Sequence, residues 1–267
     1  MNFIYLKKSI LYFAVLFMGI SHAVYSYEEI NDVDARALAL GNVKALSRGL
    51  SNPACLAFNE QKEFGGSVYN RFKMKELNTV SIYTLFPNRA IDAGVLLSSY
   101  GYEDYRLLQG QVSLAKKLSA CFSIGTRLSY LNENSILEPE NKNYFSADVG
   151  FYYRFNESFE AAFTTENLLH TRSLLPVICD MGIHYRLLPT CSVLIETGYD
   201  FKKYLDVKTG IEYEIAGQFS VRAGFRTRLK TPSLGFAYTG TQWKTEVAFL
   251  LHAVPGLSSA VGIAYFF

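Results

Sequence analysis

The chain has 267 residues, of which 49% are hydrophobic, 15% aromatic and 19% charged. Its 26 basic residues exceed its 24 acidic residues by two, and Lys7 and Lys8 account for that excess, so the rest of the chain is neutral. A neutral chain without clustered basic residues lacks the electrostatic footprint of a nucleic-acid-binding protein. The composition therefore excludes nucleic acid as an expected partner.

The first 23 residues have the features of a cleaved signal peptide. A basic start precedes an apolar core over residues 9–20, and small residues follow it. Ser21 and Ala23 match the small-residue pattern of a cleavage site, and a cut as late as residue 26 fits as well. The apolar run is too short for a membrane-spanning helix. We therefore expect a signal peptide over residues 1–23 and export to the cell envelope.

The next segment, residues 27–62, is apolar but is broken by Gly41, Gly49 and Pro53. It shows no two-residue alternation and is too interrupted to cross a bilayer as a helix. It is either a disordered tail or a segment that folds into the end of a larger structure. Disordered segments are seldom this apolar, which favours the second interpretation.

From residue 63 onward, runs of about ten residues alternate between apolar and polar or small side chains. In the run at 203–215, Leu205 and Val207 share one face, whereas Asp206 and Lys208 share the other. We count about fourteen such runs, an even number, as in single-chain outer-membrane barrels. They are residues 63–71, 77–86, 90–100, 105–116, 119–131, 144–155, 158–167, 178–187, 190–200, 203–215, 217–228, 232–240, 242–251 and 257–267.

This pattern predicts an all-β fold: a transmembrane, antiparallel, up-and-down β-barrel of about fourteen strands over residues 63–267. Soluble sandwiches, propellers and lipocalin-like barrels also contain alternating antiparallel strands. In those folds, an apolar face that recurs in nearly every run would need one very large core. The repetition therefore favours a barrel whose apolar face meets lipid.

The connections are expected to differ between the two ends of the barrel. Those after even-numbered runs are short, whereas residues 131–143 and 168–177 are expected to form long loops after odd-numbered runs. Short turns on the periplasmic side and longer loops outside are typical of outer-membrane barrels. The arrangement predicts a protein of the outer membrane of a Gram-negative bacterium, with both termini in the periplasm.

The last run ends on aromatic residues, Tyr265 and Phe267, in alternation with small ones. This ending resembles the C-terminal signal by which outer-membrane barrels are recognised for insertion. It implies the barrel-assembly machinery and outer-membrane lipid as partners. Terminal aromatic side chains also suit the membrane interface.

The faces opposite the apolar ones carry charges of both signs. A tight link near residue 216 places Glu212 opposite Arg222, within cross-strand pairing distance. The resulting charge ladder either governs passage through the lumen or closes it with stabilising ion pairs, and the interspersed signs favour closure. The predicted ladder comprises Arg127, Asp148, Asp206, Glu212, Glu214, Arg222, Arg226 and Arg228.

The sequence offers little for catalysis. The histidines stand apart from any serine or cysteine nucleophile motif, and neither a phosphate-binding loop nor metal-ligand spacing occurs. We therefore expect no enzyme, no metal site and no cofactor, with an outer-membrane enzyme as a remote alternative.

Two short stretches carry a family resemblance. Residues 35–41 read Ala-Arg-Ala-Leu-Ala-Leu-Gly, and residues 52–56 read Asn-Pro-Ala-Cys-Leu. Together they resemble the N-terminal signature of PorV-type and long-chain fatty-acid-transporter (FadL)-type outer-membrane barrels. The resemblance implies fourteen strands and an N-terminal plug or hatch, here residues 27–62. The chain departs from the signature at Asn42 and Cys55, where the family has glycine. The motif residues of the implied plug are Gly41, Asn52, Pro53, Ala54 and Leu56.

The two branches of this resemblance imply different functions. PorV-type proteins imply a structural or adaptor component of an outer-membrane system for secretion, such as type IX secretion, or for surface anchoring, with secretion or surface proteins as partners. FadL-type barrels imply a passive transporter or channel for a small hydrophobic ligand. Modest outer loops and the mixed-charge lumen favour the adaptor.

Overall fold

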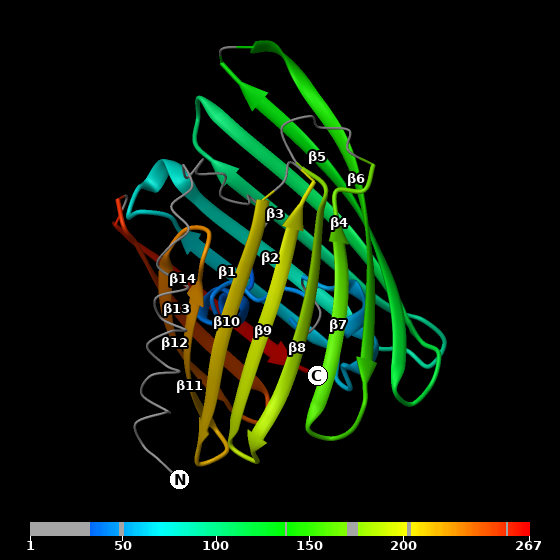
Figure 1. The fold of residues 1–267 in the computed structure, drawn as a ribbon. Helices are drawn as coiled ribbons and strands as arrows, with labels where there is room; N and C mark the ends of the chain where they lie inside the picture. The colour runs from blue at the N-terminus through cyan, green and yellow to red at the C-terminus, as the bar shows by residue number, and fades with distance from the viewer. Residues whose placement is uncertain (1–32, 48–50, 137, 170–175, 202–203, 255) are drawn as a thin grey trace.

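The computed structural model describes residues 33–47, 51–136, 138–169, 176–201, 204–254 and 256–267 (Figure 1). The expected signal peptide, residues 1–23, lies outside the described residues, as do parts of the expected plug segment. None of the described helices is long and apolar enough to cross a membrane.

The described residues form fourteen antiparallel strands that close into a barrel, with β1 hydrogen-bonded to β14. The predicted fold class is therefore confirmed. The strands are β1 (Glu63–Asn70), β2 (Asn78–Phe86), β3 (Asp92–Gly101), β4 (Tyr105–Lys117), β5 (Phe122–Ser135), β6 (Glu138–Arg154), β7 (Phe159–Glu166), β8 (Ile178–Leu188), β9 (Cys191–Asp200), β10 (Tyr204–Ile215), β11 (Phe219–Arg226), β12 (Thr231–Thr239), β13 (Trp243–His252) and β14 (Gly256–Phe266). The short helices are α2 (Ala35–Ala39), η1 (Pro53–Phe58) and η2 (Lys75–Leu77).

The alternation along each strand separates an apolar exterior from a polar interior. On β10, Leu205 and Ile211 point outward and are 62% and 51% exposed, whereas Asp206 and Lys208 point inward and are 4% and 1% exposed. Large apolar side chains stand exposed on outward positions all round the wall, among them Leu97, Leu128, Met181, Leu234 and Val261. In a soluble protein the apolar side chains usually point inward and the charged ones outward, and here this arrangement is reversed.

Aromatic side chains mark two levels on the exterior. We call the end where β1 begins and β14 ends the near rim, and the opposite end the far rim. Phe122 and Tyr153 pack together towards the near rim, and Tyr130 packs against Phe145 towards the far rim. From Phe122 to Tyr130, eight residues of strand span about 27 Å at roughly 3.3–3.4 Å per residue. A tilt of about 40° reduces this span to roughly 20 Å, close to the height of the apolar band of outer-membrane barrels.

The expected long loop at residues 131–143 is wrong. There β5 continues to Ser135 and β6 begins at Glu138, so that the hairpin rises beyond its neighbours (Figure 1). Polar cross-strand contacts support this extension: the Tyr130 hydroxyl and the Asn132 amide both donate to Asn143 Oδ1, each at 2.8 Å. Polar residues ended the apolar pattern in the sequence but did not end the strand pairing.

The expected difference in loop length between the two rims is also weaker than predicted. Residues 102–104 and 227–230 at the far rim are as short as the near-rim turns at 118–121 and 240–242. The longer far-rim connections are residues 71–77 and 167–177. The rims differ instead through the height of the β5–β6 hairpin.

Candidate functional site

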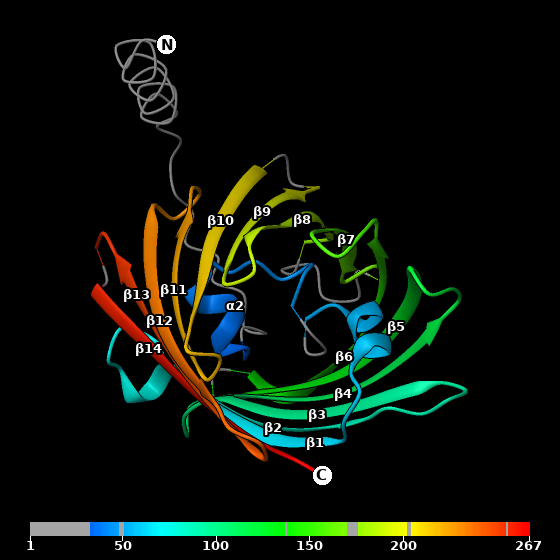
Figure 2. The same ribbon diagram turned by 90° about the horizontal axis from the view of Figure 1, so that it is seen from below.

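The described residues 33–47 and 51–58, here called the inner segment, lie inside the barrel (Figure 2). Helix α2 begins after Asp34, whose carboxylate accepts hydrogen bonds from the backbone N–H groups of Arg36 and Ala37 at 2.9 and 3.4 Å. Helix η1 begins after Asn52 in the same manner, with Pro53 at its first position. Both starts are therefore encoded locally by a capping side chain.

The inner segment follows the inner wall through most of a circuit. It meets β1 first, continues to β14 and β12, and approaches β10 and β11 together at Leu40 and Gly41. It then passes β9, β8, β6 and β5 as far as β3, which is broadly the order of the strands round the barrel. The pairs in close approach are Val33 with Ser67, Ala35 with Gly262, Ala39 with Gly235, Leu40 with Gly210, Gly41 with Gly224, Ala45 with Glu196, Leu46 with Gly182, Asn52 with Gly150, Pro53 with Gly125 and Leu56 with Gly94.

Inward-facing glycines make this close path feasible. A Cβ atom at Gly125 would lie 2.4 Å from the Pro53 carbonyl carbon, and one at Gly224 would lie 2.1 Å from the Gly41 nitrogen. Glycine in a strand interior weakens the strand and often marks a close approach of another backbone. Sequence reasoning missed these positions, although a glycine within several successive strands was a usable signal.

A line of alternating charges ties the inner segment to the wall. Arg36 pairs with Glu212 at 2.6 Å, and Arg222 bridges Glu212 and Glu246 at 2.6 Å each. Lys244 pairs with Glu246 at 2.9 Å. Burial alone would lower the pKa of the Arg36 guanidinium, but the charge and hydrogen bond of Glu212 raise it above its ordinary value. Arg36, which sequence reasoning did not single out, is thus held in its charged form.

A second group of charges holds the middle of the inner segment. The Ala45 N–H donates to Glu196 at 2.6 Å, and Lys208 pairs with Glu196 at 2.7 Å and with Asp180 at 2.9 Å. Lys208 and Glu196 are 1% and 0% exposed. Nearby, Lys44 pairs with Glu166 at 3.3 Å. Nothing in the sequence distinguished Glu196 from other acidic residues on alternating strands.

The expected plug-motif residues all belong to the inner segment and are buried. The Asn52 side chain links two parts of the inner segment by hydrogen bonds. Its Nδ2 donates to the Ala45 carbonyl at 2.7 Å, and its Oδ1 accepts from the Ala54 N–H at 3.0 Å. Gly41 and Asn42 have φ values of 75° and 67°. Asparagine tolerates this left-handed conformation better than most residues, so Asn42 can stand where the signature that this stretch resembles has glycine.

Four of the expected lumen charges form two ion pairs between neighbouring strands. Arg127 pairs with Asp148 at 2.6 Å, and Arg226 pairs with Asp206 at 2.5 Å. The register places Glu212 opposite Arg222.

Two expected members of the ladder, Arg228 and Glu214, do not lie among the buried charges of β10 and β11. Arg228 lies in the connection after β11 and pairs with Asp200 at 3.6 Å. Glu214 is exposed, because it lies only two residues before the near-rim turn that starts at Ala216. It is therefore not part of the buried ladder.

The terminal aromatic residues lie on the exterior at the near rim. The Tyr265 ring is 4.7 Å from the Trp243 ring and 4.8 Å from the Phe267 ring, measured between centroids. The Phe267 N–H donates to the Lys62 carbonyl at 3.0 Å, which ties the chain end to the start of β1.

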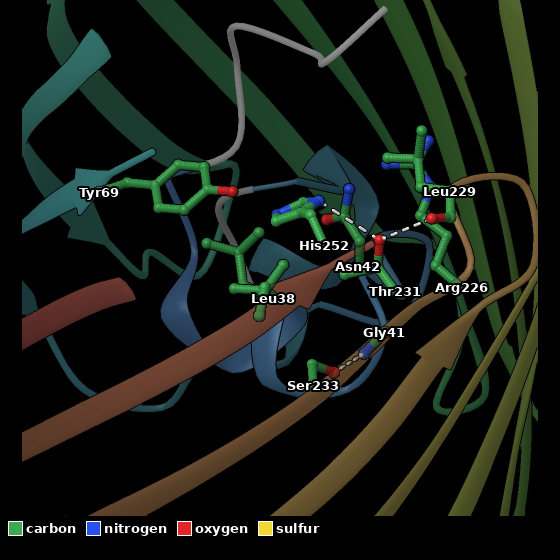
Figure 3. A pocket seen from close by; sticks show the side chains of 10 residues that line it. Leu38, Gly41, Asn42, Tyr69, Arg226, Leu229, Thr231, Ser233 and His252 are labelled. Carbon is green, nitrogen blue, oxygen red and sulfur yellow. Dashed lines mark hydrogen bonds between the residues drawn. The ribbon is translucent and has the colours of Figure 1, made fainter. Parts of the chain in front are cut away.

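A small apolar pocket lies between the inner segment and the far rim; we call it the far-rim pocket (Figure 3). It is lined by Leu38 and Asn42 of the inner segment and, at the far rim, by Tyr69, Arg226 and His252 of the strands and by Leu229 of the connection after β11. Its volume of about 10 Å³ is close to the roughly 10–15 Å³ that one water needs by the same measure. A larger guest would need side chains such as Leu229 to move.

A second pocket lies at the start of α2, towards the near rim, and we call it the near-rim pocket. Its volume is about 20 Å³, and it is lined by Val33 and Ala35 of the inner segment and by wall residues that include Ser67, Lys244 and Gly262. Among the described residues, no group of three or more His, Cys, Asp or Glu side chains is placed to hold a metal ion.

The chain matches no family model, and no curated protein sequence matches it. Its structure, a closed fourteen-strand antiparallel barrel, is nevertheless shared with solved outer-membrane channels. The monoaromatic hydrocarbon channel CymD matches with a TM-score of 0.68 at 11% identity, over 88% of this chain and 97% of that one. The Pseudomonas putida toluene transporter TodX matches with a TM-score of 0.65 at 10% identity, over 90% and 99%.

A Pseudomonas aeruginosa FadL homologue matches with a TM-score of 0.61 at 9% identity, over 88% of this chain and 97% of that one. At such identities the likeness shows the fold alone, which is that of FadL-like barrels. The FadL-type half of the expected resemblance thus has structural support, whereas the PorV-type half stays an expectation.

Proposed function

We propose that this chain is an outer-membrane barrel through which small hydrophobic molecules cross passively. The observation that carries the proposal is the likeness to hydrocarbon channels over nearly the whole of both chains. This favours the transporter over the adaptor that the sequence favoured. The same neighbours are channels and transporters, in keeping with a protein that is not an enzyme.

The exterior supports a membrane location. Exposed apolar side chains all round the wall would form a patch far larger than soluble proteins tolerate. Aromatic side chains at two levels, roughly 20 Å apart by the strand geometry above, match the girdles of outer-membrane barrels. We assign the near rim to the periplasm, and with it the start of β1 and the end of β14. In this proposal lipid surrounds the wall, and the barrel-assembly machinery recognises Tyr265 and Phe267.

The interior favours apolar over hydrophilic solutes. Inward side chains on opposite parts of the wall, such as Gln111, Ser129 and Arg222, are between 4% and 6% exposed. A water-filled pore would leave such groups accessible to solvent. A small apolar molecule needs only a brief rearrangement of packed side chains, whereas an ion or sugar needs a continuous wet path. The inner segment acts in this proposal as the plug.

The second candidate is the adaptor. The packed, ion-paired interior favours it, because a barrel that only supports a partner has no need of a passage. In that case, the β5–β6 hairpin that rises above the far rim provides the surface for a secretion or surface protein.

The test is the initial rate at which intact cells take up radiolabelled toluene. Whole cells are needed because a phospholipid bilayer alone lets hydrocarbons dissolve and pass, whereas a lipopolysaccharide leaflet slows them. Cells that produce the protein should take up toluene faster than cells that lack it, with no change in the uptake of a sugar of similar size. Equal toluene rates would contradict the transporter, and a co-purified surface protein together with equal rates would support the adaptor.

A further inference from the structure

A solute that crosses this barrel along its axis must pass the inner segment, and most of the segment's path is closed to an apolar solute. Between β5 and β11, the segment is held by contacts of its backbone with wall glycines and by buried charges. Examples of those charges are the ion pairs of Lys208 with Glu196 and of Arg127 with Asp148. Moving these groups would expose uncompensated buried ions, which is strongly unfavourable. An apolar route must therefore lie elsewhere.

The two pockets lie on the same face of α2. Leu38 lines the far-rim pocket and Ala35 lines the near-rim pocket. Residues three apart on an α-helix share a face and lie about 4.5 Å apart along its axis. One turn of helix thus separates a pocket on the far-rim side of the inner segment from a pocket on the near-rim side.

The wall strands opposite this face of α2 line both pockets. Strand β1 contributes Tyr69 to the far-rim pocket and Ser67 to the near-rim pocket, and these residues are two apart on the same inward face. Strand β13 contributes Leu250 to the first and Glu246 to the second, with Ala248 between them. The same strands therefore run past both pockets.

The material between the pockets is apolar and mostly small. It is a buried cluster of Ala35, Leu38, Ala39, Tyr69, Ala248, Leu250 and Ala260. Alanines on α2 face alanines on β13 and β14, so this contact is close but is made by short side chains that do not interlock. Arg36 lies outside this cluster and reaches Glu212 on β10, although the same charge network extends to Glu246 and Lys244 beside the near-rim pocket. The helix face can thus open along the cluster while that ion pair stays made.

We propose that small apolar molecules pass the inner segment at this one place, between the Ala35–Leu38 face of α2 and the wall formed by β13, β14 and β1. The inference rests on the proposed function. Leu38, the largest α2 side chain in the route, packs in one cluster with Tyr69 and Leu250 of the wall and must move for a solute to pass. The rest of the inner segment stays in place during passage.

The test compares two leucine deletions in the toluene uptake assay, normalised to the amount of inserted barrel. Leu38→Ala enlarges the route, whereas Leu194→Ala removes the same atoms from the cluster on β9, and both leucines are 1% exposed. We expect Leu38→Ala to raise the protein-dependent uptake rate about tenfold, which corresponds to a barrier lowered by about 1.4 kcal/mol. Leu194→Ala should leave the rate unchanged.

A second pair of substitutions keeps the test decisive if one of the leucine variants fails to fold. Ala260→Leu fills the route, and Ala162→Leu adds the same volume to the other cluster on β7. We expect Ala260→Leu to reduce uptake to the level of cells without the protein and Ala162→Leu to preserve it.

The outcomes separate the two proposals. Equal effects within each pair, in a wild-type protein that accelerates uptake, overturn the route and leave the proposed function standing. A wild-type protein that does not accelerate uptake, combined with a Leu38→Ala variant that does, overturns the function and supports the route as the weakest barrier. No acceleration by the wild-type protein or by either leucine variant overturns both.

Discussion

The contact of the inner segment with the wall glycines leads to a matched pair of substitutions. In Gly125→Ala, the new methyl would lie 2.4 Å from the Pro53 carbonyl carbon and 2.5 Å from the Ala54 nitrogen. In Gly110→Ala, the methyl would meet only Leu97, at an ordinary 3.6 Å. Both residues are in strands, so the gain of roughly 0.4–1 kcal/mol from a stiffer unfolded chain is common to both variants.

The difference between the two variants therefore isolates the overpacking at Gly125. Overpacking of this kind costs about 1–3 kcal/mol, and backbone atoms cannot swing aside as a side-chain end does. We expect the free energy of unfolding of Gly125→Ala to lie about 1–3 kcal/mol below that of Gly110→Ala.

Urea unfolding of the barrel in lipid vesicles measures this difference. The chain has one tryptophan, Trp243 on β13, whose fluorescence reports on the wall. Limited proteolysis of the same samples should cut the inner segment of Gly125→Ala faster than that of Gly110→Ala. Equal stabilities and equal cutting rates would refute a tightly seated segment.

Three further predictions concern the anchors and the chain end. Lys208→Met removes the ammonium group that pairs with the buried carboxylates of Asp180 and Glu196 and should lower the free energy of unfolding by about 3–5 kcal/mol. The exposed control Lys116→Met should change it by less than about 0.5 kcal/mol, and similar losses in both variants would contradict a stabilising role of the buried pairs. Asn52→Ala removes two buried hydrogen bonds and should cost about 1–3 kcal/mol, with faster proteolysis of the inner segment but an intact β-sheet circular dichroism spectrum; unchanged proteolysis would argue against its role. Deletion of Phe267 should reduce the amount of barrel in the outer membrane, whereas Phe267→Tyr keeps the aromatic ring and should preserve it; normal amounts after deletion would argue against the terminal signal.

The barrel was predictable because each strand carries its own signal. The alternation in residues 203–215 assigns Leu205 to lipid and Asp206 to the interior without reference to any other strand. The strand count follows from repetition of that local signal. The signal fails where both faces are polar, as around Asn132 and Asn143, and there the extent of the β5–β6 hairpin was missed.

The path of the inner segment was beyond the sequence for a physical reason. The motif around Asn52 and Pro53 predicts a turn, because Asn52 caps and Pro53 starts a helix. The partners of that turn, such as Gly125 and Gly150, are scattered over distant strands and are brought together only by closure of the barrel. Likewise, the pairing of Lys208 with Asp180 across β9 depends on the register of three strands.

The central claim, that apolar solutes pass at α2 while the rest of the inner segment stays in place, can be tested with two reversible cross-links. A Cβ at position 262 would lie 3.7 Å from that of Ala35, and one at 182 would lie 3.4 Å from that of Ala45, both near the roughly 3.5–4.5 Å typical of disulfides. Ala35→Cys with Gly262→Cys locks the route, and Ala45→Cys with Gly182→Cys locks the segment outside it, in a chain whose native cysteines are replaced by alanine.

The decisive measurement is toluene uptake by cells that carry each cross-linked barrel, before and after reduction. We expect the oxidised 35–262 pair to block uptake and reduction to restore it, whereas the barrel with the 45–182 pair should take up toluene equally in both states. Block by both cross-links would mean that the whole segment must leave, and block by neither would place the passage elsewhere. Either result would contradict passage at α2 with the rest of the inner segment in place.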